Sequence, residues 1–217
     1  MVIRDHLSDR NTYERLNETQ ATIAEQHIVN VLKSWRKKYH KNLTRNERKY
    51  LDRHLQQNIY PFGVFYATMK VHKTPLKTRP IVSVSGSLLQ ALATWVDDKL
   101  QIAAKAQRSY LESSFDLQKE MHTLTLPPHT FLFTADARSM YTNIPTHRAL
   151  QFIGRYLRTH QFPGIPVKAL MTALHIVMTN NIFTFGDTIY KQRTGTALGT
   201  PPAPPGLTST PLSMKTP

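Results

Sequence analysis

The sequence predicts an α+β fold, because segments with helical periodicity alternate with short apolar segments of strand-like composition. Apolar side chains recur at helical spacing around residues 28–35 and in residues 87–107, and strand-like segments pair up at 62–84 and 180–192. Hydrophobic residues make up 40% of the 217 residues, which is enough for a core and excludes wholesale disorder. We expect a helical basic region at 1–60, a folded central region at 61–200 and a Pro-rich disordered tail at 201–217.

Charge is the strongest compositional signal. The chain has 28 Lys and Arg against 14 Asp and Glu, a net charge of +14, which favours a polyanionic partner such as nucleic acid and, after it, an anionic membrane surface. No run of eighteen apolar residues is present, so no membrane-spanning helix is predicted, and the N-terminus lacks the apolar stretch of a secretory signal. The absence of cysteine excludes disulfide scaffolds, cysteine–zinc sites and thiol catalysis, and fits an intracellular compartment, nuclear or cytoplasmic.

The N-terminal region is predicted to contain two helices. The first helix is predicted from an apolar stripe at helical spacing, formed by Ile28, Val31, Leu32 and Trp35. A second helix is expected to begin after Thr44, because Glu47 lies three residues further on and completes a capping box.

These two helices carry a dense basic cluster between Lys33 and Arg53, a segment that contains nine basic residues and only two acidic ones. One interpretation is a surface that follows nucleic-acid phosphates; the other is an ordinary solvated face. The residues predicted to contact nucleic acid are Lys33, Arg36, Lys37, Lys38, Lys41, Arg45 and Lys49.

Two strands are predicted after this cluster. FGVFYATMKVHK is rich in β-branched and aromatic residues, TPLKT has turn composition and RPIVSV is again strand-like, so an antiparallel pair is expected. No acidic residue occurs between Arg53 and Val96, and the pair would carry four cations: Lys70, Lys73, Lys77 and Arg79.

The remaining elements follow from periodicity and turn chemistry. Residues 87–107 form the clearest amphipathic helix, and its Asp97–Asp98 pair is interpreted as part of a solvated face. The apolar run HTFLFTADA predicts a buried strand that ends at Asp136. Helices are expected at 145–160, opened by Pro145, and at 167–178, followed by a hairpin around Gly186.

Asp136 is the clearest candidate for a catalytic or metal-binding residue. A carboxylate at a strand end beside a loop is well placed to hold Mg²⁺, which can activate a hydroxyl and stabilise a pentavalent phosphorus. The plainer interpretation is an ordinary strand-end or helix-capping aspartate, and the residue by itself does not separate the two.

Three segments resemble, in order and spacing, the motifs of reverse transcriptases, especially those of Penelope-like retroelements. MKVHKTPLKTRPIVSVSGS resembles the fingers motif, FTADARSMYTNIP the first palm motif, and KQRTGTALGTPPAP the next palm motif with its glycine-rich turn. The resemblance covers roughly residues 60–205. It implies the fingers and partial palm of a right-hand polymerase, with RNA template, DNA primer and deoxynucleotide triphosphates as partners.

The resemblance also implies roles for individual residues. Asp136, helped by the backbone carbonyl of Ala137, would be the Mg²⁺ ligand, and Tyr141 would lie under the incoming sugar as a steric gate; the plainer alternative for Tyr141 is a core aromatic. Arg79, with Lys73 or Lys77, would hold the triphosphate, since fixed cations bind phosphate oxygens well. The nucleotide and template–primer track would be lined by Gln192, Gly195 and Gly199.

Polymerases of this kind need a second motif with paired aspartates after the glycine-rich turn, and residues 200–217 do not contain one. We therefore expect a truncated or frameshifted fragment that binds nucleic acid or nucleotide better than it polymerises, because two-metal transfer needs several carboxylates. Two rival hypotheses remain: a non-catalytic nucleic-acid-binding protein, and a helical basic module that uses only residues 22–57.

Overall fold

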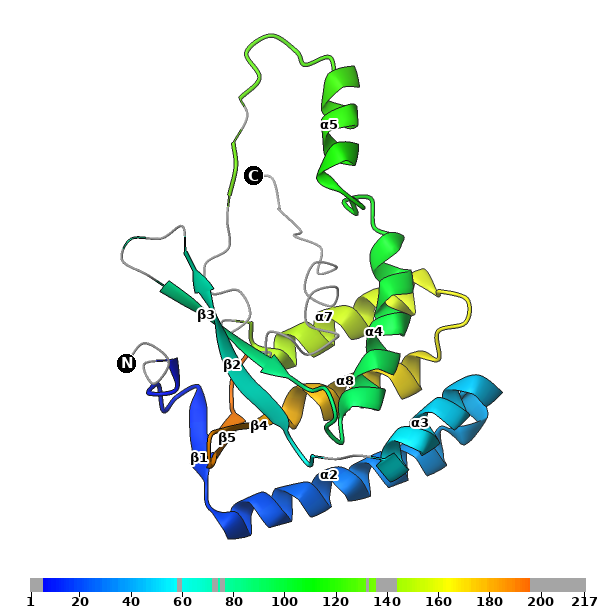
Figure 1. Cartoon of the computed structure of the whole chain (residues 1–217). Helices are drawn as coiled ribbons and strands as arrows, with labels where there is room; N and C mark the ends of the chain where they lie inside the picture. Colours follow the sequence, from blue (N-terminus) through cyan, green and yellow to red (C-terminus); the bar gives the residue numbers. More distant parts are fainter. Residues whose placement is uncertain are drawn as a thin grey trace.

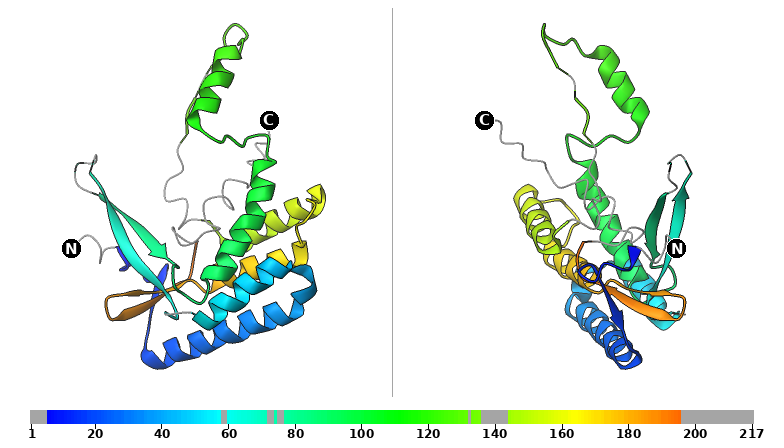
Figure 2. Two further views of the ribbon diagram at one scale, coloured as in Figure 1. Left: turned by 45° about the vertical axis from the view of Figure 1, so that its right-hand side comes forward. Right: turned by 90° about the vertical axis from the view of Figure 1, so that its left-hand side faces the viewer.

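The computed structural model describes residues 6–57, 60–71, 74, 77–131, 133–135 and 144–195. In this part of the chain, α-helices and one mixed β-sheet form an α+β fold in which the helices pack on one side of the sheet (Figure 1). A long excursion that includes residues 106–131 projects away from this body in all views (Figure 2). The coarse fold class predicted from the sequence is confirmed.

The sheet has five strands in the order β1-β5-β4-β2-β3. Their bounds are β1 Tyr13–Leu16, β2 Gly63–Lys70, β3 Lys77–Ser83, β4 Ile182–Phe185 and β5 Thr188–Gln192. Only β2 and β4 run parallel; the other three pairs are antiparallel, as predicted for β2–β3 and β4–β5. Pro80 is accommodated because β3 is an edge strand, where a missing ladder donor costs little.

The two faces of the sheet have different neighbours. Ile182 and Ile189 pack into the main core together with the helices, and Val64 and Tyr66 lie on the same face further along β2. The opposite face carries a smaller aromatic cluster in which Phe183 stacks on Phe65 at a centroid distance of 5.4 Å. Residues 6–12 cover part of this second face, since Leu7 belongs to the cluster.

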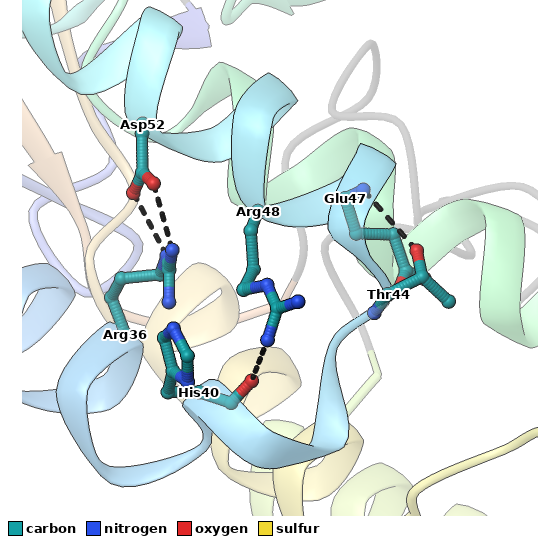
Figure 3. Close-up of polar contacts among 6 residues, drawn as sticks. All are labelled: Arg36, His40, Thr44, Glu47, Arg48 and Asp52. Carbon is teal, nitrogen blue, oxygen red and sulfur yellow. Dashed lines mark hydrogen bonds and ion pairs between the residues drawn. The ribbon is translucent and has the colours of Figure 1, made fainter.

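The N-terminal helices form an antiparallel pair, α2 (Glu18–Lys38) and α3 (Arg45–Gln57), joined through the short 3₁₀ turn His40–Asn42. The predicted apolar stripe of α2 faces the core, where the Trp35 indole donates a buried hydrogen bond to the Ala169 carbonyl at 3.0 Å. The capping box that opens α3 is also confirmed. The Thr44 backbone N–H donates to Glu47 at 2.6 Å, and the Glu47 N–H donates to the Thr44 hydroxyl at 3.3 Å (Figure 3).

The other helices are α4 (Gln90–Lys105), α5 (Ser114–Thr123), α7 (Thr146–His160) and α8 (Val167–Thr179). Helix α4 packs against α3 and α8, and α7 packs against α8, so these helices make one continuous layer. The predicted helices at 87–107, 145–160 and 167–178 are thus confirmed to within a few residues. Gly186 supplies the left-handed backbone, with φ of 57°, that the tight β4–β5 turn requires.

Two predictions about this region were wrong in their described parts. Residues 129–131 and 133–135 form no strand, and Phe131 and Phe133 are 91% and 78% exposed. The described residues of this segment lie on the projecting excursion and pair with none of the five strands of the sheet. Asp97 is half-buried on α4 rather than solvated, whereas its neighbour Asp98 is exposed as expected.

Candidate nucleic-acid interface

The β2–β3 hairpin gathers three cations on one face. Antiparallel register places Lys70 directly opposite Lys77, and Thr68 opposite Arg79, so the three basic side chains share a face with Tyr66. Lys77 and Arg79 are exposed, and Tyr66 is 46% exposed. This is the helix-side face of the sheet, beyond the point where the helices cover it.

The register leaves positive charge uncompensated. Like charges directly opposite each other destabilise a strand pair, and Lys70 and Lys77 are opposite each other in this way. No ion pair joins these two lysines or Arg79 to an acidic residue of the described chain. An anion bound across the hairpin would relieve this repulsion, because Arg can offer two parallel hydrogen bonds to a phosphate while each Lys offers a point charge.

The basic cluster of α2 and α3 is divided by its contacts. Arg36 is largely buried and forms a bidentate pair with Asp52, with nitrogen–oxygen distances of 2.8 and 2.7 Å (Figure 3). Arg48 donates to the His40 carbonyl at 3.4 Å, so Arg36 joins α2 to α3, and Arg48 joins α3 to the turn between them. The other predicted contact residues are exposed: Lys33, Lys37, Lys38, Lys41, Arg45 and Lys49.

Four of these exposed cations surround the turn between α2 and α3. Lys37 and Lys38 end α2, Lys41 lies in the 3₁₀ turn and Arg45 begins α3, so the turn is a continuous basic ridge. The Lys38 ammonium lies 5.3 Å from the centre of the Tyr39 ring. Such a ridge can follow a phosphate backbone without reading bases.

Gln192 and Gly195 lie at the other end of the sheet. Gln192 is buried, and its amide donates to the Thr194 carbonyl at 2.8 Å. The Gly195 carbonyl accepts from the Thr146 hydroxyl at 3.2 Å, which joins this segment to the start of α7. Because Gln192 lies beside the beginning of β4 and Arg79 beside the end of β2, the structure does not bring these predicted residues together.

Five other predicted site residues lie outside the described residues: Lys73, Asp136, Ala137, Tyr141 and Gly199. Within the described ranges, no group of three or more Asp, Glu or His side chains could hold a metal ion. The interface that can be built from the structure consists of cations and aromatic side chains. Also within those ranges, no helix combines the length and the apolar character needed to cross a membrane.

Sequence reasoning assigned Lys70 to the edge of a strand and did not consider Tyr66. The sequence shows that side chains alternate between the two faces along β2. Which β2 residues lie opposite Lys77 and Arg79 depends on the hairpin register. Comparison with known proteins adds no assignment: no family model, no curated protein and no solved structure matches this chain.

Proposed function

We propose that this chain forms the fingers and part of the palm of a reverse transcriptase of the Penelope-like type. In the intact enzyme the activity would be RNA-templated DNA synthesis; Asp136 and the Ala137 carbonyl would hold Mg²⁺, which would supply a Lewis acid to the primer hydroxyl. The chain itself binds template–primer and deoxynucleotide triphosphate. This proposal begins from the resemblance of three ordered motifs and is supported by one feature of the structure.

That feature is the unpaired positive face of the β2–β3 hairpin. Arg79 and Lys77 belong to the segment that resembles the fingers motif, and they share a face with Lys70 without a described carboxylate to offset them. A triphosphate carries several negative charges on closely spaced oxygens, which matches cations fixed on a two-stranded scaffold. The plainer role of charges on an edge strand is to discourage pairing with another chain.

Nucleotide titration separates these roles. Removing Arg79 should weaken binding of a fluorescent deoxynucleotide triphosphate by about tenfold, since a charge-assisted hydrogen bond is lost. Lys49→Ala removes an exposed cation from α3 and should change this affinity by less than about twofold. Arg79→Ala should leave the thermal midpoint close to that of the parent chain, because the side chain is exposed.

The second candidate function is nucleic-acid binding without catalysis, and the basic ridge at the α2–α3 turn favours it. If Arg79→Ala and Lys49→Ala weaken nucleotide binding equally, general basicity holds the nucleotide and this second function replaces the first. In both cases RNA and DNA affinity should fall steeply with salt, because phosphate contacts release counterions. Changing Lys37, Lys38 and Lys41 to Ala should reduce that slope.

A further inference from the structure

A concave surface lies at the edge of the sheet opposite to the hairpin cations. It is a cleft of about 610 Å³ between residues 7–10 and the two strands β1 and β5. Three guanidinium groups line it, from Arg10, Arg15 and Arg193, together with the rings of Tyr13 and Tyr190. The residues come from both ends of the described chain and meet because β1 pairs with β5.

The cleft is positively charged. Glu14 is the acidic residue among its lining side chains, and it pairs with Arg193 at 3.1 Å. The hydrogen bond from Arg193 lowers the pKa of Glu14, so this carboxylate is ionised at neutral pH and offsets one of the three cations. Arg10 and Arg15 form no ion pair with an acidic residue of the described chain, which leaves two guanidinium groups available to an anion.

The aromatic wall of the cleft is held in place by the core behind it. Tyr190 stacks on Phe183 with a centroid distance of 5.9 Å and an interplanar angle of 18°, and Tyr13 meets Phe183 edge-on at the same distance. Phe183 is fully buried, so the Tyr190 ring has a fixed orientation at the cleft surface. Register places Arg15 directly opposite Tyr190, so a cation and a ring lie side by side.

We infer that this cleft binds a nucleotide unit, with its phosphate on Arg10 and Arg15 and its base stacked on Tyr190. Arg favours phosphate oxygens, and a fixed aromatic ring accepts any base by stacking. The volume lies within the range of small-ligand sites. A stacked base must be free of a pairing partner, so the source is a single strand or a free nucleotide.

This site is distinct from the proposed nucleotide site on the hairpin. Arg15 and Tyr190 share the sheet face of Phe183 and Phe65, whereas Arg79 lies opposite Thr68 on the other face. The experiment therefore uses the full chain with Lys77→Gln and Arg79→Gln already introduced. The hairpin site is already disabled in that background. Any further loss of binding therefore reports on the cleft and not on the hairpin.

Arg15→Gln is the decisive variant, and Arg108→Gln is its control, because Arg108 is also exposed, does not line the cleft and loses the same charge. Anisotropy of a fluorescein-labelled oligothymidylate should show binding about tenfold weaker for Arg15→Gln, and a change below about twofold for Arg108→Gln. Equal effects of the two variants would overturn the assignment of the cleft.

The ring is tested by Tyr190→Leu and Tyr190→Phe. The leucine variant should weaken oligothymidylate binding by about tenfold and the phenylalanine variant should retain it, since stacking on the ring persists. Unchanged binding in a folded Tyr190→Leu protein, with a native far-ultraviolet spectrum, would contradict base recognition. Competition by thymidine diphosphate identifies a free nucleotide as the source, and resistance to it identifies a single strand.

Discussion

Helices α4 and α5 follow each other along the chain and both contain large apolar side chains, yet only α4 is part of the core. Half of the sixteen residues of α4 are buried, with Leu100 at 1% exposure, whereas none of α5 is buried and its Phe115 is 71% exposed. Helix α4 has α3 and α8 beside it, while α5 lies on the projecting excursion (Figures 1 and 2). Apolar composition alone therefore did not decide burial; the presence of a packing partner did.

The largest expected effect comes from truncating one leucine in each helix. Leu100→Ala in α4 should lower the free energy of unfolding by about 2–5 kcal/mol, because transfer energy is lost and a cavity remains. Leu117→Ala in α5, where the side chain is 43% exposed, should change it by less than about 1 kcal/mol. Urea denaturation of both variants measures the difference, and similar losses would mean that α5 is packed in solution.

A smaller effect is expected at the contact between α3 and α4. Burial alone would raise the pKa of Glu47, but hydrogen bonds from Lys99, Thr44 and Trp95 outweigh it and lower the pKa from 4.5 to about 2. The Lys99 ammonium and the Trp95 indole lie 2.8 and 2.9 Å from this carboxylate. Because the folded pKa is below the unfolded one, the stabilisation is fully present above pH 4.5 and is lost as the pH falls toward 2.

Glu47→Gln tests this coupling. The variant should be less stable than the parent at pH 7, and the gap should narrow as the pH falls from 5 to 3, with a total effect of about 1–2 kcal/mol once solvent screening is allowed for. Urea midpoints across this pH range provide the measurement. A gap that stays constant with pH would show that the Glu47 charge contributes nothing to the contact.

The smallest effect concerns the two adjacent aspartates of α4. Burial raises the pKa of Asp97, and its Oδ1 is buried without a hydrogen-bond partner in the described chain. Since the folded pKa lies above the unfolded one, ionisation of Asp97 destabilises the fold as the pH rises through this range. Asp97→Asn should therefore raise stability at pH 7 by about 0.5–1 kcal/mol.

The adjacent residue supplies the control for that measurement. Asp98 is exposed on the same helix, so Asp98→Asn removes the same charge without relieving any burial. Its effect on the thermal midpoint should be close to zero. A stabilisation shared by both variants would indicate a general effect of net charge on α4 rather than relief at Asp97.

Local patterns were sufficient for much of this fold. The α3 capping box, the stripe that ends at Trp35 and the Gly186 turn each depend on a few neighbouring residues, and all three were predicted. Strand β1 was not predicted, since four residues without clear alternation become a strand only because β5 supplies hydrogen-bond partners. The buried strand expected to end at Asp136 is absent from its described residues, 129–131 and 133–135, because these residues pair with no strand of the sheet.

The candidate sites show the same division. Sequence reasoning found Lys77 and Arg79 because they lie within one motif, and it assigned phosphate contact to Arg36, which the structure shows engaged by Asp52. It gave no hint of the cleft, because Arg15 and Tyr190 are far apart in the chain and carry no spacing signal. Whether a basic side chain is free to bind an anion, and which aromatic ring lies beside it, depends on contacts between residues distant in sequence, which local patterns do not reveal.

The pairing of β1 with β5 has a consequence for how the protein is made. Tyr13 lies opposite Gln192, so during synthesis the first described strand must wait for the last described strand before its backbone groups are paired. Contacts of such long sequence separation slow folding, because a large loop must be closed before they form. During synthesis, the antiparallel α2–α3 pair and the β2–β3 hairpin can form early from local contacts, whereas the cleft at Arg15 and Tyr190 comes into being only in the final step of folding.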